Sequence, residues 1–166
     1  MQADTPILDP AVSMATTVLP QGCTNFKLRQ LMRRVAHHYD AEMAKCGLKT
    51  TQYSLLSHVV SLGPIRPGDL AVAMKMDAST LTRNLRPLVD AGWVTLQAGA
   101  DARSRLVHIT DAGRDKRAEA KSHWKAAQLT LNETLGADRV QALHVLVDDS
   151  LALLAALPTQ ETGHDD

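Results

Sequence analysis

Two short helical patterns followed directly by two short alternating segments most strongly restrict how this chain can fold. Residues 68–76 read as a short helix, and a second helix begins at Ala78 and stops near Gly92. Residues 93–97 and 105–109 then alternate between apolar and polar side chains, which is typical of strands. Small residues join these two segments. The order predicts a helix-turn-helix followed by a β-hairpin.

Further helical patterns flank this unit on both sides. Apolar residues recur at helical spacing over residues 25–45 and 50–63, and again over 110–135 and 136–157. The predicted fold class is mainly α with a small β-hairpin: a winged helix-turn-helix plus a helical dimerisation region formed by the N- and C-terminal helices. The apolar stripes of the long helices exceed what so small a core can bury, which favours a homodimer.

The chain of 166 residues is expected to divide into five segments. In chain order, these are a flexible N-terminal arm (1–22), N-terminal helices for dimerisation and support (23–65), the winged helix-turn-helix (66–112), C-terminal dimerisation helices (113–157) and an acidic tail (158–166).

The net charge of zero conceals an uneven distribution. Residues 24–50 contain six Lys or Arg against two Asp or Glu, and residues 66–117 contain nine against six. Residues 118–166, in contrast, contain three against eight. This asymmetry is compatible with an anionic partner that meets one face of the protein, and equally with ordinary solvated surface.

The sequence offers no signal for export, membrane insertion or catalysis. No apolar run is long enough to span a bilayer, and the opening segment lacks the basic and apolar regions of a secretion signal. Cys23 and Cys46 form neither a disulfide framework nor a zinc-ligand spacing. A cytoplasmic protein without cofactor or membrane partner is expected. An enzyme is not expected, because no nucleophile–base pair, metal cluster or phosphate loop is recognisable.

The helix that begins at Ala78 has two chemically different sides. At about 100° per residue, its leucines cluster on one side, and the centre of that cluster lies opposite Arg83. The polar side carries Ser79, Thr80, Arg83 and Arg86. Short hydroxyl side chains permit close approach in a major groove, and a guanidinium can grip guanine O6 and N7 with two hydrogen bonds. No acidic residue lies between Asp77 and Asp90, so this side favours DNA over a plain solvated helix.

Two further residues shape this helix. Asp77 is the expected N-cap, because its carboxylate can accept the unpaired backbone N–H groups of the first turn. Pro87 removes the N–H that would bond to the carbonyl of Arg83, and we expect it to kink the last turn without breaking the helix.

The hairpin connection offers a second nucleic-acid element. It places Asp101, Arg103 and Arg105 at a tip too small to pack against anything. Arginine favours a narrow, negative minor groove, and Asp101 can orient Arg103 as a bidentate pair.

These motifs carry a family likeness. The segment "LAVAMKMDASTLTRNLRPLVDAGWVTLQAGADARSRLVHITDAG" resembles the MarR family of bacterial transcriptional regulators. It follows that family's order of Leu-Ala, Ser-Thr-x-Thr-Arg, Leu-x-x-x-Gly-x-Val, Asp-x-Arg-Ser-Arg and Leu-Thr-x-x-Gly, the last of which reads Ile109-Thr110-Asp111-Ala112-Gly113 here. In the order and type of its elements, the likeness covers roughly residues 25–157.

The resemblance implies a dimer in which each subunit contributes a winged helix and both termini build an all-helical dimerisation region. Such proteins bind a pseudo-palindromic operator and usually repress genes until a small molecule intervenes. The residues that would face the major groove are Ser79, Thr80, Thr82, Arg83 and Arg86, and Arg103 would enter the minor groove.

Regulators of this family often sense their effector in a cleft between the dimerisation region and the winged helix. The candidate ligand-binding residues here are Arg29, His38, Tyr39, His58 and Trp124. A pocket with cationic and imidazole groups would suit a small aromatic carboxylate. The competing interpretation is that each is a surface or core residue without a ligand.

A thiol-based redox sensor that acts through Cys23 is a second interpretation of the sensing function. Organic-peroxide sensors of this family use a cysteine near the start of the first helix, activated by tyrosines. Tyr39 occupies one tyrosine position, but Asn25 stands at the reactive position and Thr50 replaces the second tyrosine. Near Lys27 and a helix N-terminus, Cys23 is either a reactive thiol or an inert one.

The histidines do not indicate a metal site. They are His37, His38, His58, His108, His123, His144 and His164. Apart from the adjacent His37 and His38, which point to different sides of a helix, none forms a pair at ligand spacing, so no metal site is expected.

The winged helix could also serve as a protein-interaction module instead of a DNA reader. In that case the polar side of residues 79–86 would be dispensable, and binding would depend little on salt.

Overall fold

The structure, a computed structural model, describes residues 22–99 and 105–156. The elements are α1 (Thr24–Met43), the 3-10 helix η1 (Ala44–Cys46), α2 (Thr50–Leu62), α3 (Pro67–Ala73), α4 (Ala78–Asp90), β1 (Val94–Ala98), β2 (Arg105–Ile109), α5 (Asp111–Leu135) and α6 (Ala137–Ala155). This order confirms the predicted mainly α fold with a small β-hairpin.

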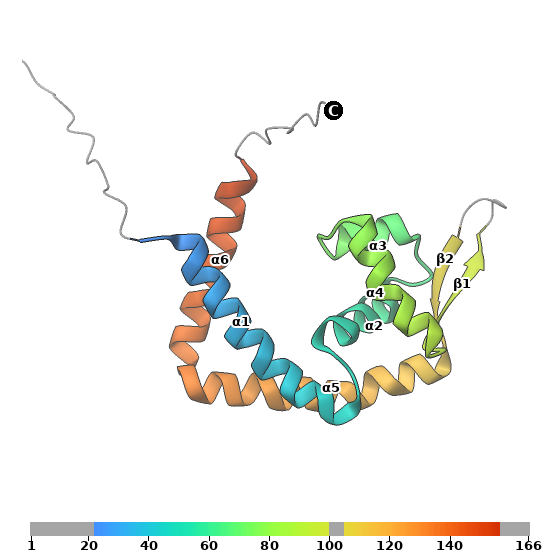
Figure 1. The fold of residues 1–166 in the computed structure, drawn as a ribbon, viewed down its shortest axis with the longest axis horizontal. Helices are drawn as coiled ribbons and strands as arrows, with labels where there is room; N and C mark the ends of the chain where they lie inside the picture. The colour runs from blue at the N-terminus through green and yellow to red at the C-terminus, as the bar shows by residue number, and fades with distance from the viewer. Residues whose placement is uncertain (1–21, 100–104, 157–166) are drawn as a thin grey trace, which may run out of the picture.

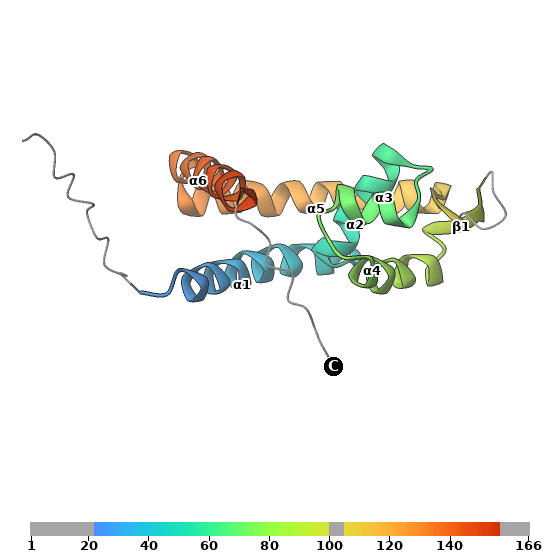
Figure 2. The same cartoon turned by 90° about the horizontal axis from the view of Figure 1, so that it is seen from above.

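The long helix α5 connects two parts of the molecule (Figure 1). At its N-terminal end, α2, α3, α4 and the hairpin gather into the winged helix. Near its other end lie α1 and α6, which are well separated when the molecule is seen from above (Figure 2). Helix α4 is the second helix of the helix-turn-helix, which is called the recognition helix in such folds. It lies at the opposite end of the fold from the terminal helices α1 and α6.

The winged helix is organised around a core of aliphatic side chains. The fully or almost fully buried side chains are Leu55, Leu56, Val59, Leu70, Leu81, Leu85, Leu88, Val94 and Val107. On α2, Leu55, Leu56 and Val59 belong to this core, whereas the neighbouring Val60 is only half-buried. Each of α2, α3, α4 and the two strands contributes to this core. The buried leucines of α4 pack into it, so the opposite, polar side of α4 faces solvent.

The hairpin is antiparallel, and its register pairs Val94 with Ile109 and Ala98 with Arg105. Ile65, which follows α2, adds an isolated bridge to Val107. The backbone bonds are 2.8 Å from the Val107 N–H to the Ile65 carbonyl and 3.3 Å in the other direction. These two hydrogen bonds attach the hairpin to the segment that follows α2, in addition to its covalent connections to α4 and α5.

Polar contacts join α1 to α5. His38 donates from Nε2 to the carbonyl of Ala127 at 2.8 Å, and the Tyr39 hydroxyl donates to Gln128. Further along, His123 Nδ1 lies 3.2 Å from a carboxylate oxygen of Glu42. Lys45 also donates a hydrogen bond to Glu42. The hydrogen bonds from Lys45 and His123 lower the pKa of the Glu42 carboxyl, which favours its ionised form.

The helices at both ends expose apolar surface, as the sequence predicts. On α6, the stripe begins with the buried Val140, but Val147 and Leu151 are exposed. On α1, the side chain of Met32 is 65% exposed. The same holds for Phe26, Leu28 and Leu31 on α1 and for Val145, Leu146, Leu153 and Leu154 on α6. Surface of this kind is typical of a protein–protein contact.

Within the described residues, no helix combines the length and apolar character that a membrane span requires.

Candidate nucleic-acid interface

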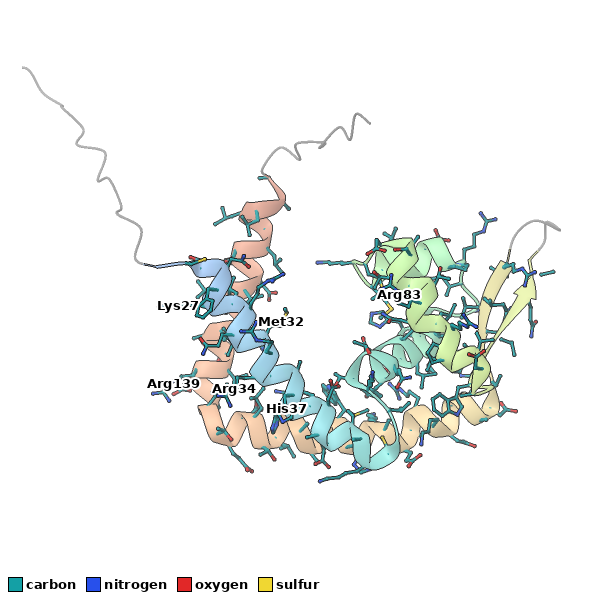
Figure 3. All side chains as sticks on the ribbon, viewed as in Figure 1. Lys27, Met32, Arg34, His37, Arg83 and Arg139 are labelled. Carbon is teal, nitrogen blue, oxygen red and sulfur yellow. The ribbon has the colours of Figure 1, made fainter. Side chains whose placement is uncertain are left out.

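The recognition helix α4 is anchored by leucines and presents a polar face to solvent. Leu81 and Leu88 are completely buried, and Arg83 and Arg86 on the other side are exposed. Arg83 lies on α4 (Figure 3) and is exposed, and no salt bridge or hydrogen bond joins it to another residue that the structure describes.

Arg86 is only loosely held. Its Nε lies 3.8 Å from a carboxylate oxygen of Asp90, and both side chains are largely exposed. An exposed ion pair of this length stabilises a protein very little. Arg86 can consequently leave Asp90 for a phosphate or a base at small cost.

Asp77 is the N-cap of α4, as predicted. One carboxylate oxygen accepts from the Thr80 backbone N–H at 2.7 Å and from the Ser79 hydroxyl at 2.6 Å, and the other accepts from the Thr80 hydroxyl at 2.7 Å. The Ser79 hydroxyl and the backbone N–H and hydroxyl of Thr80 hold the pKa of the Asp77 carboxyl well below its usual range. The start of the recognition helix is thus fixed by an ionised side chain.

This cap predicts a pH-dependent contribution to stability. Because the folded state lowers the pKa of Asp77, its stabilisation is complete above the unfolded value of about 3.9 and is lost as the pH falls towards the folded value. We expect Asp77→Ala to lower the melting temperature at pH 6, and the difference from the wild type to shrink below about pH 4. Thermal melts at a series of pH values measure this. Asp77→Asn is the control, because asparagine can still cap the helix but does not titrate. If the difference in melting temperature between Asp77→Ala and the wild type persisted unchanged into acid, the prediction would be contradicted.

Pro87 does not interrupt the recognition helix. The helix continues to Asp90, and the Ala91 N–H donates to the Pro87 carbonyl at 3.1 Å. The prediction that the helix is unbroken is confirmed. The kink itself stays a prediction.

The wing is described only in part. Arg105 is the first residue of β2, lies opposite Ala98 and is exposed. Asp101 and Arg103 fall outside the described residues, so the minor-groove contact of Arg103 and its orientation by Asp101 stay predictions.

The segment after the wing fixes the hairpin to α5, a role that the sequence motif did not reveal. Thr110 is the N-cap of α5, and its hydroxyl oxygen accepts from the Gly113 N–H at 3.0 Å. The same hydroxyl lies 2.8 Å from the Gly92 carbonyl, to which it donates. The end of α4, the hairpin and α5 therefore meet at one side chain.

An apolar groove of about 630 Å³ lies between α1, α2, α5 and α6. Its lining includes Leu31, Met32, Val35, Tyr39 and Trp124, and Asp40 is the charged residue among its lining side chains. The aliphatic residues of α1 were not predicted to line a pocket, because helical periodicity indicates only that they pack against something. Only the tertiary arrangement leaves them uncovered.

The structure does not bring the five candidate ligand residues together in one pocket. Tyr39 and Trp124 line the apolar groove, and burial raises the pKa of Tyr39. His58 lines a separate pocket of about 240 Å³ with Met74 and Lys75. The remaining two are elsewhere: His38 bonds to α5, and Arg29 is exposed on α1.

Cys23 is exposed at the start of α1, where it serves as the N-cap. Its sulfur accepts from the Phe26 N–H at 3.4 Å. Tyr39 lies 16 residues further along the chain, which corresponds to roughly 24 Å of helix, so these two side chains of one subunit do not meet. Redox sensing through Cys23 stays a prediction, and Tyr39 of the same chain does not assist it.

Known sequences that are similar to this chain include members of the MarR family and proteins described as transcriptional regulators. The sequence model of the MarR family matches residues 47–104. Two Bacillus subtilis (strain 168) proteins described as uncharacterized HTH-type transcriptional regulators are similar. YwoH is 28% identical over 90 residues, which cover 54% of this chain and 66% of YwoH. YdgG is 29% identical over 106 residues, which cover 62% of this chain and 63% of YdgG. The chain thus spans just under two thirds of the length of each relative.

Solved structures share the fold over most of the chain. The Mycobacterium tuberculosis transcriptional regulator MosR, in complex with DNA, aligns with a TM-score of 0.68 and 28% identity over 82% of this chain and 100% of MosR. The transcriptional repressor CouR, bound to a 23-mer DNA duplex, aligns with a TM-score of 0.72 and 22% identity over 78% of this chain and 92% of CouR. MarR from E. coli aligns with a TM-score of 0.63 and 22% identity, covering 78% and 97% of the two chains. The matching segment, the regulator relatives and the shared winged-helix fold together show that this chain is similar to regulators of the MarR family.

Proposed function

We propose that this protein is a sequence-specific DNA-binding transcriptional regulator whose α4 lies in the major groove. The observation that carries the proposal is the exposed face of α4, where Arg83 has no partner among the described residues and shares the helix surface with the hydroxyl residues Ser79, Thr80 and Thr82. The leucines on the opposite side of α4 are buried in the core, which keeps this polar face directed towards solvent. MosR, which shares the fold, forms a complex with DNA, and this supports the proposal. Proteins of the MarR family are DNA-binding regulators and not enzymes.

We also propose that the regulator acts as a homodimer on a pseudo-palindromic operator. The apolar surfaces of α1 and α6 lie at the end of the fold remote from α4 (Figure 1), where a second copy can cover them without obstructing the recognition helix. A two-fold axis there would place two recognition helices about one turn of DNA apart.

We propose, finally, that the regulator is a repressor released by a small aromatic molecule. The apolar groove favours the aromatic part of such an effector through Tyr39 and Trp124. A carboxylate finds complementary groups in the smaller pocket, which is lined by both Lys75 and His58. The aromatic side chains and the cationic groups therefore line two different pockets, whereas the sequence predicted a single pocket that contains both.

Selection of bound duplexes from a random DNA pool tests the DNA-binding proposal. With the purified full chain at near-physiological salt, we expect enrichment of an inverted repeat with half-sites about one helical turn apart. The enriched duplex then serves as the probe for an effector screen that begins with aromatic acids. A folded dimer that enriches no sequence, and whose weak binding hardly depends on salt, would contradict the proposal and favour a protein-interaction module.

Replacement of Arg83 tests the base-reading face directly. Because its side chain is exposed, we expect Arg83→Ala to weaken binding to the selected duplex by roughly 1–3 kcal/mol and to relax the preference at one base pair. Fluorescence anisotropy with matched and single-substituted duplexes measures both effects. Arg34→Ala on α1, far from α4 (Figure 3), is the matched control and should leave the base preference unchanged.

A further inference from the structure

Three hydroxyl hydrogens on the polar face of α4 are already committed within the protein. The Ser79 and Thr80 hydroxyls bond to the Asp77 carboxylate at 2.6 Å and 2.7 Å, and the Thr82 hydroxyl bonds to the Ala78 carbonyl at 2.8 Å. A carboxylate and a peptide carbonyl can only accept hydrogen bonds. In all three contacts the hydroxyl is consequently the donor, and its oxygen retains lone pairs.

The two bonds to Asp77 resist exchange for contacts with DNA. The same three donors that cap the helix keep the pKa of Asp77 far below neutrality, so the carboxylate is ionised whenever DNA is bound near neutral pH. Hydrogen bonds to an ionised acceptor are roughly twice as strong as neutral ones. A Ser79 or Thr80 hydroxyl that donated to DNA would have to give up such a bond and leave the carboxylate underpaired.

Because each hydroxyl hydrogen is already donated within the protein, the hydroxyls can form hydrogen bonds only with DNA groups that donate. In the major groove, adenine N6 and cytosine N4 donate, whereas guanine O6, guanine N7 and thymine O4 accept, as do all phosphate oxygens. Hydroxyl oxygens with only lone pairs to offer are complementary to the amino groups alone. The neighbouring Arg83, which can only donate, is complementary to guanine.

We propose that Asp77 is a positioning residue for base specificity: by holding the hydrogens of Ser79 and Thr80, it makes both hydroxyls acceptors that select adenine or cytosine amino groups beside the guanine read by Arg83. This inference rests on the proposed function, since it takes α4 to lie in the major groove. Asp77 needs no contact with DNA for this role, because it acts through the direction of two hydroxyl bonds.

The proposal makes a specific statement about the selected sequence. Guanine carries its O6 where adenine carries its amino group, and thymine carries its O4 where cytosine carries its amino group. In Asp77→Ala, the freed hydroxyls can donate. The preference at the positions that face them should therefore change from adenine to guanine or from cytosine to thymine, while the guanine opposite Arg83 is retained.

Parallel selections with the full-length wild type, Asp77→Ala and Asp77→Asn measure this change. Asp77→Asn keeps an oxygen for the Thr80 N–H, but its amide nitrogen cannot accept, so one hydroxyl is released and one position should change. It also provides the test if Asp77→Ala does not fold. Arg34→Ala on α1, far from α4 (Figure 3), is the control and should select the same bases as the wild type.

A second measurement removes the amino group from the DNA. When purine replaces the selected adenine, or when a pyrimidine without the N4 amino group replaces the selected cytosine, we expect wild-type affinity to fall about fivefold. A combined Ser79→Ala and Thr80→Val variant should show no such loss. A merely structural cap would alter overall affinity in the Asp77 variants without altering which base is preferred.

The proposed function and the role of Asp77 fail on different outcomes. If the folded wild-type dimer selected no sequence, the proposed function and this inference would both be overturned. If the wild type selected a defined site, but the Asp77 variants selected the same bases and the amino-free duplexes bound equally well, only the role of Asp77 would be overturned.

Discussion

Replacing Gly113 with alanine is expected to destabilise the folded chain by more than about 3 kcal/mol, the upper end of ordinary overpacking costs. A Cβ at this position would lie 2.0 Å from the Trp93 carbonyl oxygen and 2.7 Å from the Ile109 Cδ1. The oxygen cannot easily withdraw, because it accepts from the Thr110 N–H at 3.1 Å. The new methyl group would have to push α5 away from the hairpin.

Urea denaturation at a fixed protein concentration measures this effect, since the stability of a dimer depends on concentration. Gly68→Ala is the matched control: Gly68 lies in the first turn of α3, and a Cβ there would meet nothing within 4 Å. Alanine at that position should leave stability unchanged or raise it slightly, because glycine is the poorer helix former. Equal stability of the two variants would show that the contact between α5 and the hairpin tolerates a side chain.

Leu81→Ala is expected to cost about 2–5 kcal/mol, the range for removing a large buried aliphatic side chain. Leu81 is 0% exposed and lies on the opposite side of α4 from Arg83. The cavity would remove the support of the recognition helix, so operator binding should weaken together with stability.

The denaturation midpoint should fall without a change in the slope of the transition, which would identify a loss of stability and not of compactness. Val72→Ala on α3 is the control, because Val72 is 77% exposed and its truncation leaves no cavity. A Leu81 variant as stable as the Val72 variant would mean that α4 is held mainly by its caps and not by its leucines.

The succession of elements was predictable because each carries its own local signal. Alternation placed the second strand at residues 105–109, where it is found, and the first within one residue of its place. The carboxylate of Asp77 and the glycine at Gly92 marked the two ends of α4. Capping and periodicity act over a few residues, so they can be read without knowledge of the fold.

The effector candidates were less predictable. Arg29, His38, Tyr39, His58 and Trp124 were grouped by residue type and by family likeness. Which of them share a pocket depends on how α1 packs on α5, and that packing turns His38 onto the Ala127 carbonyl and directs Tyr39 to Gln128. A backbone carbonyl has no signature in the sequence that would announce such a partner.

The winged helix could be predicted from the sequence alone, because the 3.6-residue and 2-residue periods, the caps and the small-residue connection are all local properties. The same periods predict that α4 turns Arg83 away from its leucines. Three features, in contrast, follow from the three-dimensional arrangement: the Ser79 and Thr80 hydroxyls donate to Asp77, Gly113 lies against the Trp93 carbonyl, and the apolar residues of α1 border an open groove. These features depend on atoms brought within hydrogen-bond or van der Waals distance by the fold, and a pattern of residue types does not specify such distances.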